Sequence, residues 1–205
     1  MDVKATSLEH TTPAALNAGV AEAREESFAR DEGRLTELAR KAVEAYVLLG
    51  QIIEPPTFPE TSPLGRPSAC FVCIKTRARE LRGCIGTVEP EYATLAEEVT
   101  ANAVKAATRD PRFRPVSGDE LPSLLYSVDV LGTLEPARFE ELNPSAFGVV
   151  VTDQSGSRRG LLLPDIESIE TAGQQVGVAA RKAGIKPGEP LRLYRFRTRR
   201  FSEWA

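Results

Sequence analysis

The sequence predicts an α+β fold with mostly antiparallel sheets packed with helices. Three observations lead there: segments with apolar residues every three or four positions, short apolar or β-branched runs between turn residues, and a hairpin signal between two of those runs. The chain has 205 residues, of which 41% are hydrophobic and 27% charged. That is enough for one large domain, or two small lobes, with a sizeable core.

The N-terminal part, residues 1–34, is predicted to be an extension of a domain that spans 35–205. It is rich in Ala, Glu, Ser and Thr, and Ala14–Arg30 has the weak apolar spacing of a polar surface helix. It holds seven acidic and four basic residues, which accounts for the formal net charge of −3. The single histidine, His10, also lies there, so we expect a neutral body without an imidazole.

The composition and termini exclude several classes of protein. A body without basic excess is not typical of a nucleic-acid-binding protein. The first residues lack the apolar core of a signal peptide, and no apolar run is long enough to span a membrane. The sequence therefore predicts a soluble, cytoplasmic protein with reduced cysteines.

The first strong helical pattern starts at Leu35 and ends before Gly50, a residue typical of helix ends. Closely spaced prolines make 51–68 an extended linker. The next prediction is a buried strand at Cys70–Lys75. The strand that returns beside it is expected to begin at Glu80–Leu81.

A second helix is predicted from the capping-box pair Thr94 and Glu97 to about Arg109, with Pro111 after its end. Its inner stripe consists of Leu95, Val99, Asn102, Ala103 and Ala106. We expect Glu97, Glu98 and Lys105 to face water.

The second half of the chain predicts further strands at Leu124–Leu131 and Gly148–Val151, and a hairpin turn at Gln154–Ser157 that leads into Gly160–Leu163. The pair Thr171 and Gln174 fits another capping box, and this helix should end near Gly184. The segment Leu191–Phe201 is expected to close the chain as one long strand.

Leu81–Thr87, with the sequence LRGCIGT, is the segment most suggestive of chemistry. Gly83 and Gly86 allow a positive φ and a close approach of other groups, and Arg82 could favour a thiolate at Cys84. Successive N–H groups in a turn of this kind can bind an anion. The alternative is a glycine-rich bend in a strand with an inert, buried cysteine.

LRGCIGT resembles the signature of the AMMECR family, the AMME syndrome chromosomal-region candidate protein and its microbial relatives. Other segments, in family order, extend the resemblance over about residues 35–203. They are Ala39–Tyr46, Phe71–Ile74, Glu89–Pro90, Asn102–Ala103, Ala106–Ala107, Asp110–Phe113, Glu120–Pro122, Ser127–Leu131, Arg159–Pro164, Arg181–Gly184 and Leu193–Phe196. The 1–34 extension and the short loop at Pro164–Glu170 depart from the family pattern.

The resemblance implies an α+β fold with a larger and a smaller lobe around a cleft, and a signature segment at or near that cleft. It implies no settled activity. Microbial relatives are associated with a Memo-like protein and a radical-SAM enzyme, which suggests these two as partners in a modification pathway.

The favoured functional hypothesis is a ligand- or protein-binding accessory module of such a pathway. Arg82, Arg112 and Asp110 would anchor a charged group, and Gly83, Gly86 and Thr87 would shape the surface around it. Asn102, a polar residue on an apolar stripe, would pin the Gly83–Gly86 segment through hydrogen bonds. For Asp110–Phe113 the alternative is a helix-ending turn whose charges pair with each other and whose Phe113 lies in the core.

Two alternative functions stay open. The first is an enzyme that uses Cys84 as a nucleophile, although a thiol usually needs a base and the body has no histidine. The second is nucleic-acid binding through Arg192–Arg200. Alternation in one strand would divide these arginines, because Arg195, Arg197 and Arg199 would share one face and Arg192 and Arg200 the other.

No metal site or cofactor is predicted. Cys70 and Cys73 have the spacing of half a zinc site, but residues three apart in a strand point to opposite faces. We therefore expect both to be small core residues. With Cys84 there are three cysteines, an odd number that does not suggest a disulfide framework.

Overall fold

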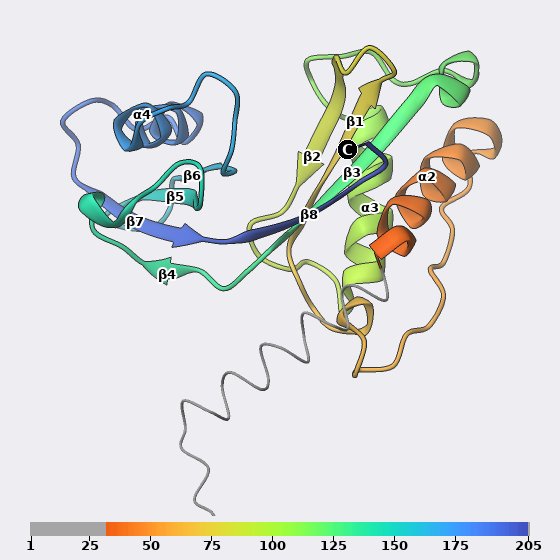
Figure 1. The fold of residues 1–205 in the computed structure, drawn as a ribbon, viewed down its shortest axis with the longest axis horizontal. Coiled ribbons are helices and arrows are strands. Elements are labelled where there is room, and N and C mark those ends of the chain that lie inside the picture. The colour runs from red at the N-terminus through yellow and green to blue at the C-terminus, as the bar shows by residue number, and fades with distance from the viewer. Residues whose placement is uncertain (1–31, 205) are drawn as a thin grey trace, which may run out of the picture.

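The structure, a computed structural model, describes residues 32–204, which form two lobes side by side (Figure 1). The predicted helix at Ala14–Arg30 and His10 lie outside the described residues. Each lobe contains one four-stranded antiparallel sheet, with strand order β2-β1-β3-β8 in lobe 1 and β4-β7-β5-β6 in lobe 2. The α+β fold predicted from the sequence is therefore confirmed.

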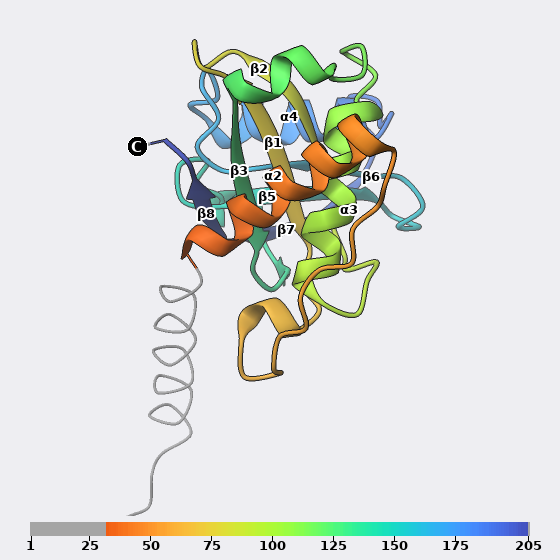
Figure 2. The same cartoon turned by 90° about the vertical axis from the view of Figure 1, so that its right-hand side faces the viewer.

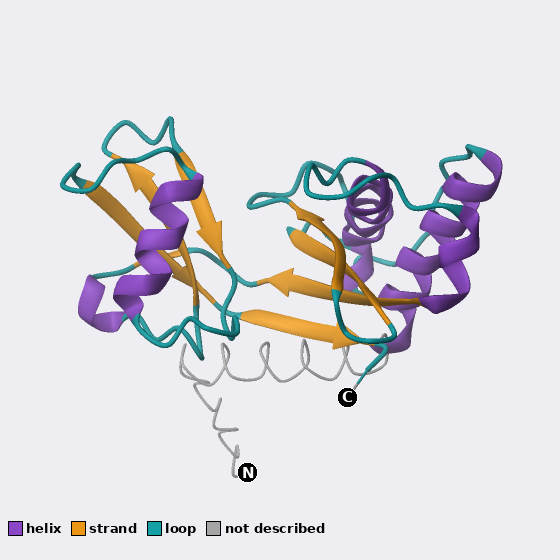
Figure 3. Ribbon diagram, turned by 90° about the horizontal axis from the view of Figure 1, so that it is seen from above, coloured by secondary structure: helices purple, strands orange, loops and turns teal. Residues whose placement is uncertain are grey.

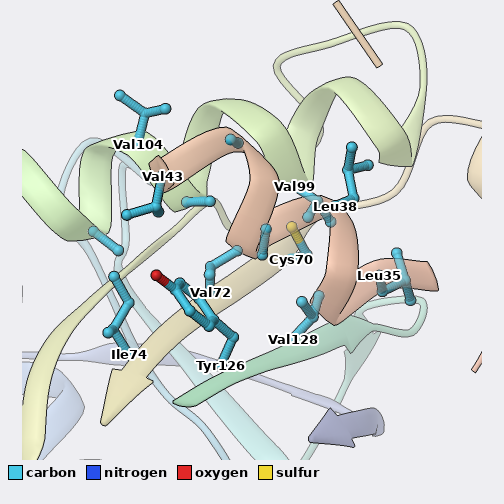
Figure 4. Packing of buried hydrophobic residues seen from close by; sticks show 14 of the residues in the cluster. Leu35, Leu38, Val43, Cys70, Val72, Ile74, Val99, Val104, Tyr126 and Val128 are labelled. Carbon is cyan, nitrogen blue, oxygen red and sulfur yellow. The ribbon is translucent and has the colours of Figure 1, made fainter. Parts of the chain in front are cut away.

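Lobe 1 places both of its helices on one face of its sheet (Figure 2). Its elements are α2 (Glu32–Leu49), β1 (Cys70–Thr76), β2 (Leu81–Gly86), α3 (Leu95–Thr108), β3 (Leu124–Leu131) and β8 (Thr198–Ser202), with 3-10 turns at Pro63–Gly65 and Gly118–Ser123. Alternate strand residues meet the helices in a continuous apolar core. Cys70, Val72 and Tyr126 are fully buried in it (Figure 4).

Lobe 2 has a single long helix on one face of its sheet, and seen from above the helices of the two lobes occupy separate places (Figure 3). Its elements are β4 (Glu135–Pro136), a 3-10 turn (Phe139–Glu141), β5 (Gly148–Asp153), β6 (Arg159–Leu162), α4 (Ala172–Lys182) and β7 (Leu191–Phe196). The predicted hairpin between Gly148 and Leu163 is confirmed as β5 and β6.

The predicted helix ends are also confirmed. Gly50 and Gly184 both have a φ of 67°, in the left-handed region where glycine carries no Cβ penalty. Thr94 and Thr171 cap α3 and α4, and both capping boxes are complete. Local side-chain chemistry thus decides where these helices begin and end.

The two lobes repeat the same hairpin–helix–strand path. In lobe 1 the path runs β1-β2-α3-β3 and in lobe 2 it runs β5-β6-α4-β7, and in both the first strand lies between the other two. The fourth helical residue is a buried polar side chain in each case, Glu98 in α3 and Gln175 in α4. Gln175 donates to the carbonyls of Phe147 and Leu163, at the two ends of its hairpin.

Glu98 corrects one expectation, because it is fully buried rather than facing water. Its carboxylate accepts hydrogen bonds from the Thr87 hydroxyl (2.5 Å) and from the backbone N–H groups of Glu91 (2.8 Å) and Tyr92 (3.0 Å). Glu98 thereby holds the loop that leads from β2 to α3. A buried carboxylate is tolerated here because several donors converge on it.

The expected long strand Leu191–Phe201 is also corrected, because it is two strands in two different sheets. β7 ends at Phe196 in lobe 2, and β8 begins at Thr198 in lobe 1. Arg197 lies at the crossing, where its carbonyl accepts a hydrogen bond from Gly132 N–H (2.8 Å). Both halves have strand composition, so the sequence pattern does not reveal the change of sheet.

The lobes meet through an apolar junction. Leu131 and Ala69 of lobe 1 share a buried cluster with Val150, Leu161 and Phe196 of lobe 2. An ion pair between Glu89 and Arg159 (2.7 Å) also joins the lobes at the surface. Apolar contact in the interior, rather than a flexible tether, thus sets the position of lobe 2.

Candidate functional site

The LRGCIG segment is the strand β2, at the edge of the lobe 1 sheet, and not a turn. Neither Gly83 nor Gly86 has a positive φ. A Cβ on Gly83 would collide with the Ala106 carbonyl of α3, and one on Gly86 would collide with the Phe71 ring. The two glycines therefore allow close packing, and of the two interpretations of this segment the structure has the glycine-rich strand and not the anion-binding turn.

Cys84 forms a disulfide with Cys73, which lies directly opposite it on β1. The Cα–Cα distance of 4.1 Å fits a non-hydrogen-bonded pair of antiparallel strands. The expectation of reduced cysteines is thus corrected, and in this form Cys84 has no thiolate to act as a nucleophile. A pairing of residues eleven apart depends on strand register, which the sequence alone does not provide.

The other cysteine, Cys70, is buried on the helix side of β1. Cys70 and Cys73 thus point to opposite faces, as their spacing predicts. Cys73 is only half-buried, however, so its expected place in the core was wrong. Among residues 32–204 no group of three His, Cys, Asp or Glu side chains is placed to hold a metal ion.

Asp110 and Arg112 cover the outer edge of β2 at Cys84. In a non-hydrogen-bonded pair the N–H and C=O groups of Cys84 point away from β1. The Cys84 N–H donates to Asp110 Oδ2 (2.8 Å), and Arg112 Nη2 approaches the Cys84 carbonyl (3.5 Å). These contacts satisfy a strand edge that would otherwise be free to pair with another chain.

The two charged side chains also pair with each other. Arg112 Nε and Nη2 donate to the two oxygens of Asp110 at 2.9 and 2.7 Å. These hydrogen bonds, with the Cys84 and Arg112 N–H groups, lower the pKa of the buried Asp110 carboxyl to about 2. The pairing agrees with the alternative prediction for this segment, although Phe113 is half-buried rather than in the core.

Arg82 is held in a similar clamp. Its guanidinium donates to both oxygens of Glu120 (2.6 and 2.9 Å) and to the carbonyls of Arg114 (3.0 Å) and Pro115 (3.4 Å). Hydrogen bonding from Arg82 lowers the pKa of Glu120 to about 2. Arg82 thus fastens the segment after α3 to the start of β2.

Thr87 and Asn102 both contact the backbone at the start of β1. The Thr87 N–H and the Asn102 amide both donate to the Cys70 carbonyl at 3.1 Å. Asn102 therefore holds the start of β1, and the expected hydrogen bonds to Gly83–Gly86 are replaced by this contact. Its buried Oδ1 has no partner in the described part of the chain.

A cavity of about 780 Å³ opens beside these clamps. It is lined by residues of lobe 1, namely Arg82, Arg112, Phe113, Arg114, Pro115, Ser117 and Glu120. The Arg112 side chain is 54% exposed despite its ion pair, and Arg114 is exposed. Arg114 was not among the predicted site residues, and its proximity to Arg112 in the sequence was the available signal.

Lys182 of α4 brings further positive charge toward this region from lobe 2. Burial of its ammonium group and the charge of Arg112 lower its pKa. The ammonium donates to the Leu161 carbonyl (3.4 Å), so a carbonyl and not a carboxylate is its hydrogen-bond partner. The region therefore has more cationic than anionic groups, since Asp110 and Glu120 face three arginines and Lys182.

The C-terminal arginines are divided between the lobes, although Arg195 and Arg197 both lie over the Phe147 ring, 4.7 and 4.5 Å from its centre. Arg195 pairs with Glu135 (3.2 Å) in lobe 2, and Arg200 pairs with the buried Asp129 (2.7 Å) in lobe 1. Their separation into β7 and β8 distributes the charge over both lobes. The structure thus offers little support for a nucleic-acid interface along Arg192–Arg200. No helix among residues 32–204 has the length and apolar character needed to cross a bilayer.

Comparison with known proteins gives consistent matches over the body of the chain. A sequence model of the AMMECR1 family matches residues 36–201. A protein of Thermotoga maritima is 43% identical over 165 residues, which cover 80% of this chain and 94% of the relative. A protein of Clostridium acetobutylicum is 37% identical over 179 residues, but the match covers only 38% of that longer protein.

A solved structure resembles the fold as well. The crystal structure of an uncharacterised protein from Pyrococcus horikoshii matches with a TM-score of 0.75 and 30% sequence identity. The match covers 84% of this chain and 91% of that one, so it extends over both lobes.

Proposed function

The chain belongs to the AMMECR1 family, and we propose that it is a binding module whose cavity beside β2 accepts an anionic group. One observation carries this proposal. Arg112 and Arg114 are exposed and line one cavity, and no carboxylate pairs with Arg114 among the described residues. A group with a negative charge would complete the pairing that the protein leaves open.

The chemistry of the lining favours a carboxylate or a phosphate. Guanidinium groups bind both through two parallel hydrogen bonds, which fixes orientation as well as charge. Asp110 and Glu120 hold Arg112 and Arg82 in place before a ligand arrives. Such preorganisation reduces the entropy lost on binding. The Phe113 ring, 5.5 Å from the Arg112 guanidinium carbon and 5.9 Å from that of Arg82, supports both side chains.

The role we propose is that of an accessory module in a modification pathway. The family resemblance suggests a Memo-like protein and a radical-SAM enzyme as partners. The longer Clostridium acetobutylicum relative supports a module that works beside further protein regions, since the match covers 38% of it. We propose a binding role rather than catalysis by Cys84, because the sulfur of Cys84 is in a disulfide.

Binding is tested with two simple probes, inorganic pyrophosphate and a tetraglutamate peptide, in isothermal titrations of the full chain. We expect at least one of them to bind, with an affinity that falls as salt rises. Arg114→Ala should weaken binding by about tenfold or more, since a hydrogen-bonded charge pair contributes about 1.5–3 kcal/mol. Arg114 is the suitable probe, because the side chains of Arg82 and Arg112 also hold the fold.

Arg138→Ala is the matched control, because it removes the same charge from an 80% exposed side chain in lobe 2. The affinity of the Arg138→Ala variant for the probe should equal that of the unaltered protein. Equal affinities for all three proteins, or no binding of either probe at millimolar concentration, would show that the cavity is not an anion site.

A further inference from the structure

The Cys73–Cys84 disulfide lies on the face of the lobe 1 sheet that α2 and α3 leave uncovered. In β1, the side chains of Cys70, Val72 and Ile74 point toward the helices and are buried. Cys73 alternates with them and so points to the other face, together with Cys84. Both cysteines of the disulfide are only partly buried, so the bond is not enclosed in the core.

Backbone pairing holds the two strands together on both sides of this bond. β1 and β2 are consecutive strands of a hairpin, paired from Phe71 and Gly86 to Lys75 and Leu81. The disulfide therefore closes a short loop that backbone hydrogen bonds already close. Since the constraint that a disulfide places on the unfolded chain grows with loop length, this separation of eleven residues gives a smaller stabilisation than a long loop would.

Other contacts hold β2 independently of the sulfurs. Gly83 packs against the Ala106 carbonyl of α3 on the helix side. At the outer edge, Asp110 and Arg112 bind the backbone of Cys84. We expect β2 to stay in place when the disulfide is opened.

We propose that Cys73 and Cys84 form a thiol–disulfide exchange site in the folded protein, which a reduced dithiol opens and which the reverse exchange with an oxidised dithiol closes. One thiolate of the dithiol attacks a cysteine sulfur, the S–S bond breaks, and the second cysteine leaves as a thiolate that takes up a proton. The remaining thiol of the dithiol then attacks the mixed disulfide and releases the first cysteine. Two electrons pass to the protein, and the dithiol becomes a disulfide.

The disulfide is connected with the charged cavity through the backbone of Cys84. The Cys84 backbone is bound to Asp110 and Arg112, and Arg112 lines the cavity. A change at the Cys84 sulfur therefore occurs in the residue whose backbone this charged pair holds. The exchange itself does not rest on anion binding, and its test needs no ligand.

Cys70 supplies an internal control within the same strand. It is fully buried, and burial raises the pKa of its thiol far above the usual value. A thiol in that state offers almost no thiolate to an alkylating reagent. In the folded protein, labelling should therefore distinguish Cys70 from the other two cysteines.

The experiment is alkylation of the full chain with iodoacetamide after exposure to oxidised or reduced dithiothreitol, followed by peptide mass spectrometry. Circular dichroism monitors the fold throughout. We expect no labelled cysteine in the oxidised sample and labelled Cys73 and Cys84 in the reduced one. Cys70 should react only after guanidinium is added, and reoxidation should restore protection of the pair.

Two results would overturn the proposal. Labelling of Cys73 and Cys84 in the oxidised sample would mean that no disulfide forms. A disulfide that resists excess reduced dithiothreitol until the protein unfolds would mean that the bond is structural and closed to exchange.

Variants test the pair separately. Cys73→Ser should leave Cys84 open to labelling without any reductant, and glutathione disulfide should trap it as a lasting mixed disulfide. Cys70→Ser is the matched control and should keep the reversible protection of Cys73 and Cys84. Should Cys73→Ser fail to fold, the labelling of the unaltered protein still decides the matter.

Discussion

Replacing Asp110 by asparagine tests how strongly the Asp110–Arg112 clamp holds the edge of β2. The pKa of the Asp110 carboxyl is about 2 in the folded protein, against the usual 3.8. That difference corresponds to about 2 kcal/mol of folding free energy at neutral pH. Asparagine keeps the shape and one acceptor oxygen for the Cys84 N–H, but it removes the charge that Arg112 binds.

The pH dependence follows from the sign of the shift. A carboxyl group whose pKa is lowered on folding stabilises the protein fully above 3.8, and this contribution disappears as the pH falls through 2. We therefore expect the free energy of unfolding of Asp110→Asn to be lower by about 2 kcal/mol at pH 7. The difference should shrink by about 1 kcal/mol by pH 3, because the Asp110 carboxyl is then mostly protonated in the unfolded chain, while it is still mostly charged in the folded protein.

The assay is urea unfolding followed by circular dichroism at pH 7, 5, 4 and 3. Other carboxyl groups with lowered pKa values, such as Glu120, are present in both proteins and cancel in the difference. Asp119→Asn, at an exposed position on the neighbouring turn, is the matched control and should change stability by less than about 0.5 kcal/mol. A difference that stays constant from pH 7 to pH 3 would refute the reasoning, as would equal stability of the two variants.

Two further substitutions test the packing of lobe 1. Gly83→Ala should lower the free energy of unfolding by about 1–3 kcal/mol, because its Cβ meets the Ala106 carbonyl, whereas Gly33→Ala, with open space in α2, should be neutral or stabilising. Similar effects in thermal unfolding would contradict this account. Glu98→Gln should cost about 1–3 kcal/mol and speed hydrogen exchange of the Glu91 and Tyr92 amides, which lose a charged acceptor. Unchanged exchange at both amides would argue against the role of Glu98.

Local signals in the sequence were sufficient for most of the fold. The apolar spacing after Leu35 and the capping residues Thr94 and Thr171 act within one or two helical turns, and the structure confirms them. The change of sheet at Arg197 could not be predicted, because it depends on which distant strands pair. The burial of Glu98 depends likewise on donors that the fold brings to it from the loop before α3.

The candidate site was harder to predict for the same reason. The LRGCIGT segment singled out the right region, but its glycines serve contacts with Ala106 and Phe71. The partner of Cys84 follows only from the register between β1 and β2. Arg114 becomes a candidate binding residue only because it lines the cavity that forms when the segment after α3 folds against β2. Such relations between distant parts of the chain leave no periodic pattern in the sequence.

The crossing at Gly132 and Arg197 has a consequence for the order of folding during synthesis. The chain leaves lobe 1 after β3, builds all of lobe 2, and returns to lobe 1 only for β8. A ribosome therefore makes every strand of lobe 2 before it makes the last strand of lobe 1. Until then β3 has an unpaired edge, which β8 covers in the folded domain. The lobe that starts second can be completed first.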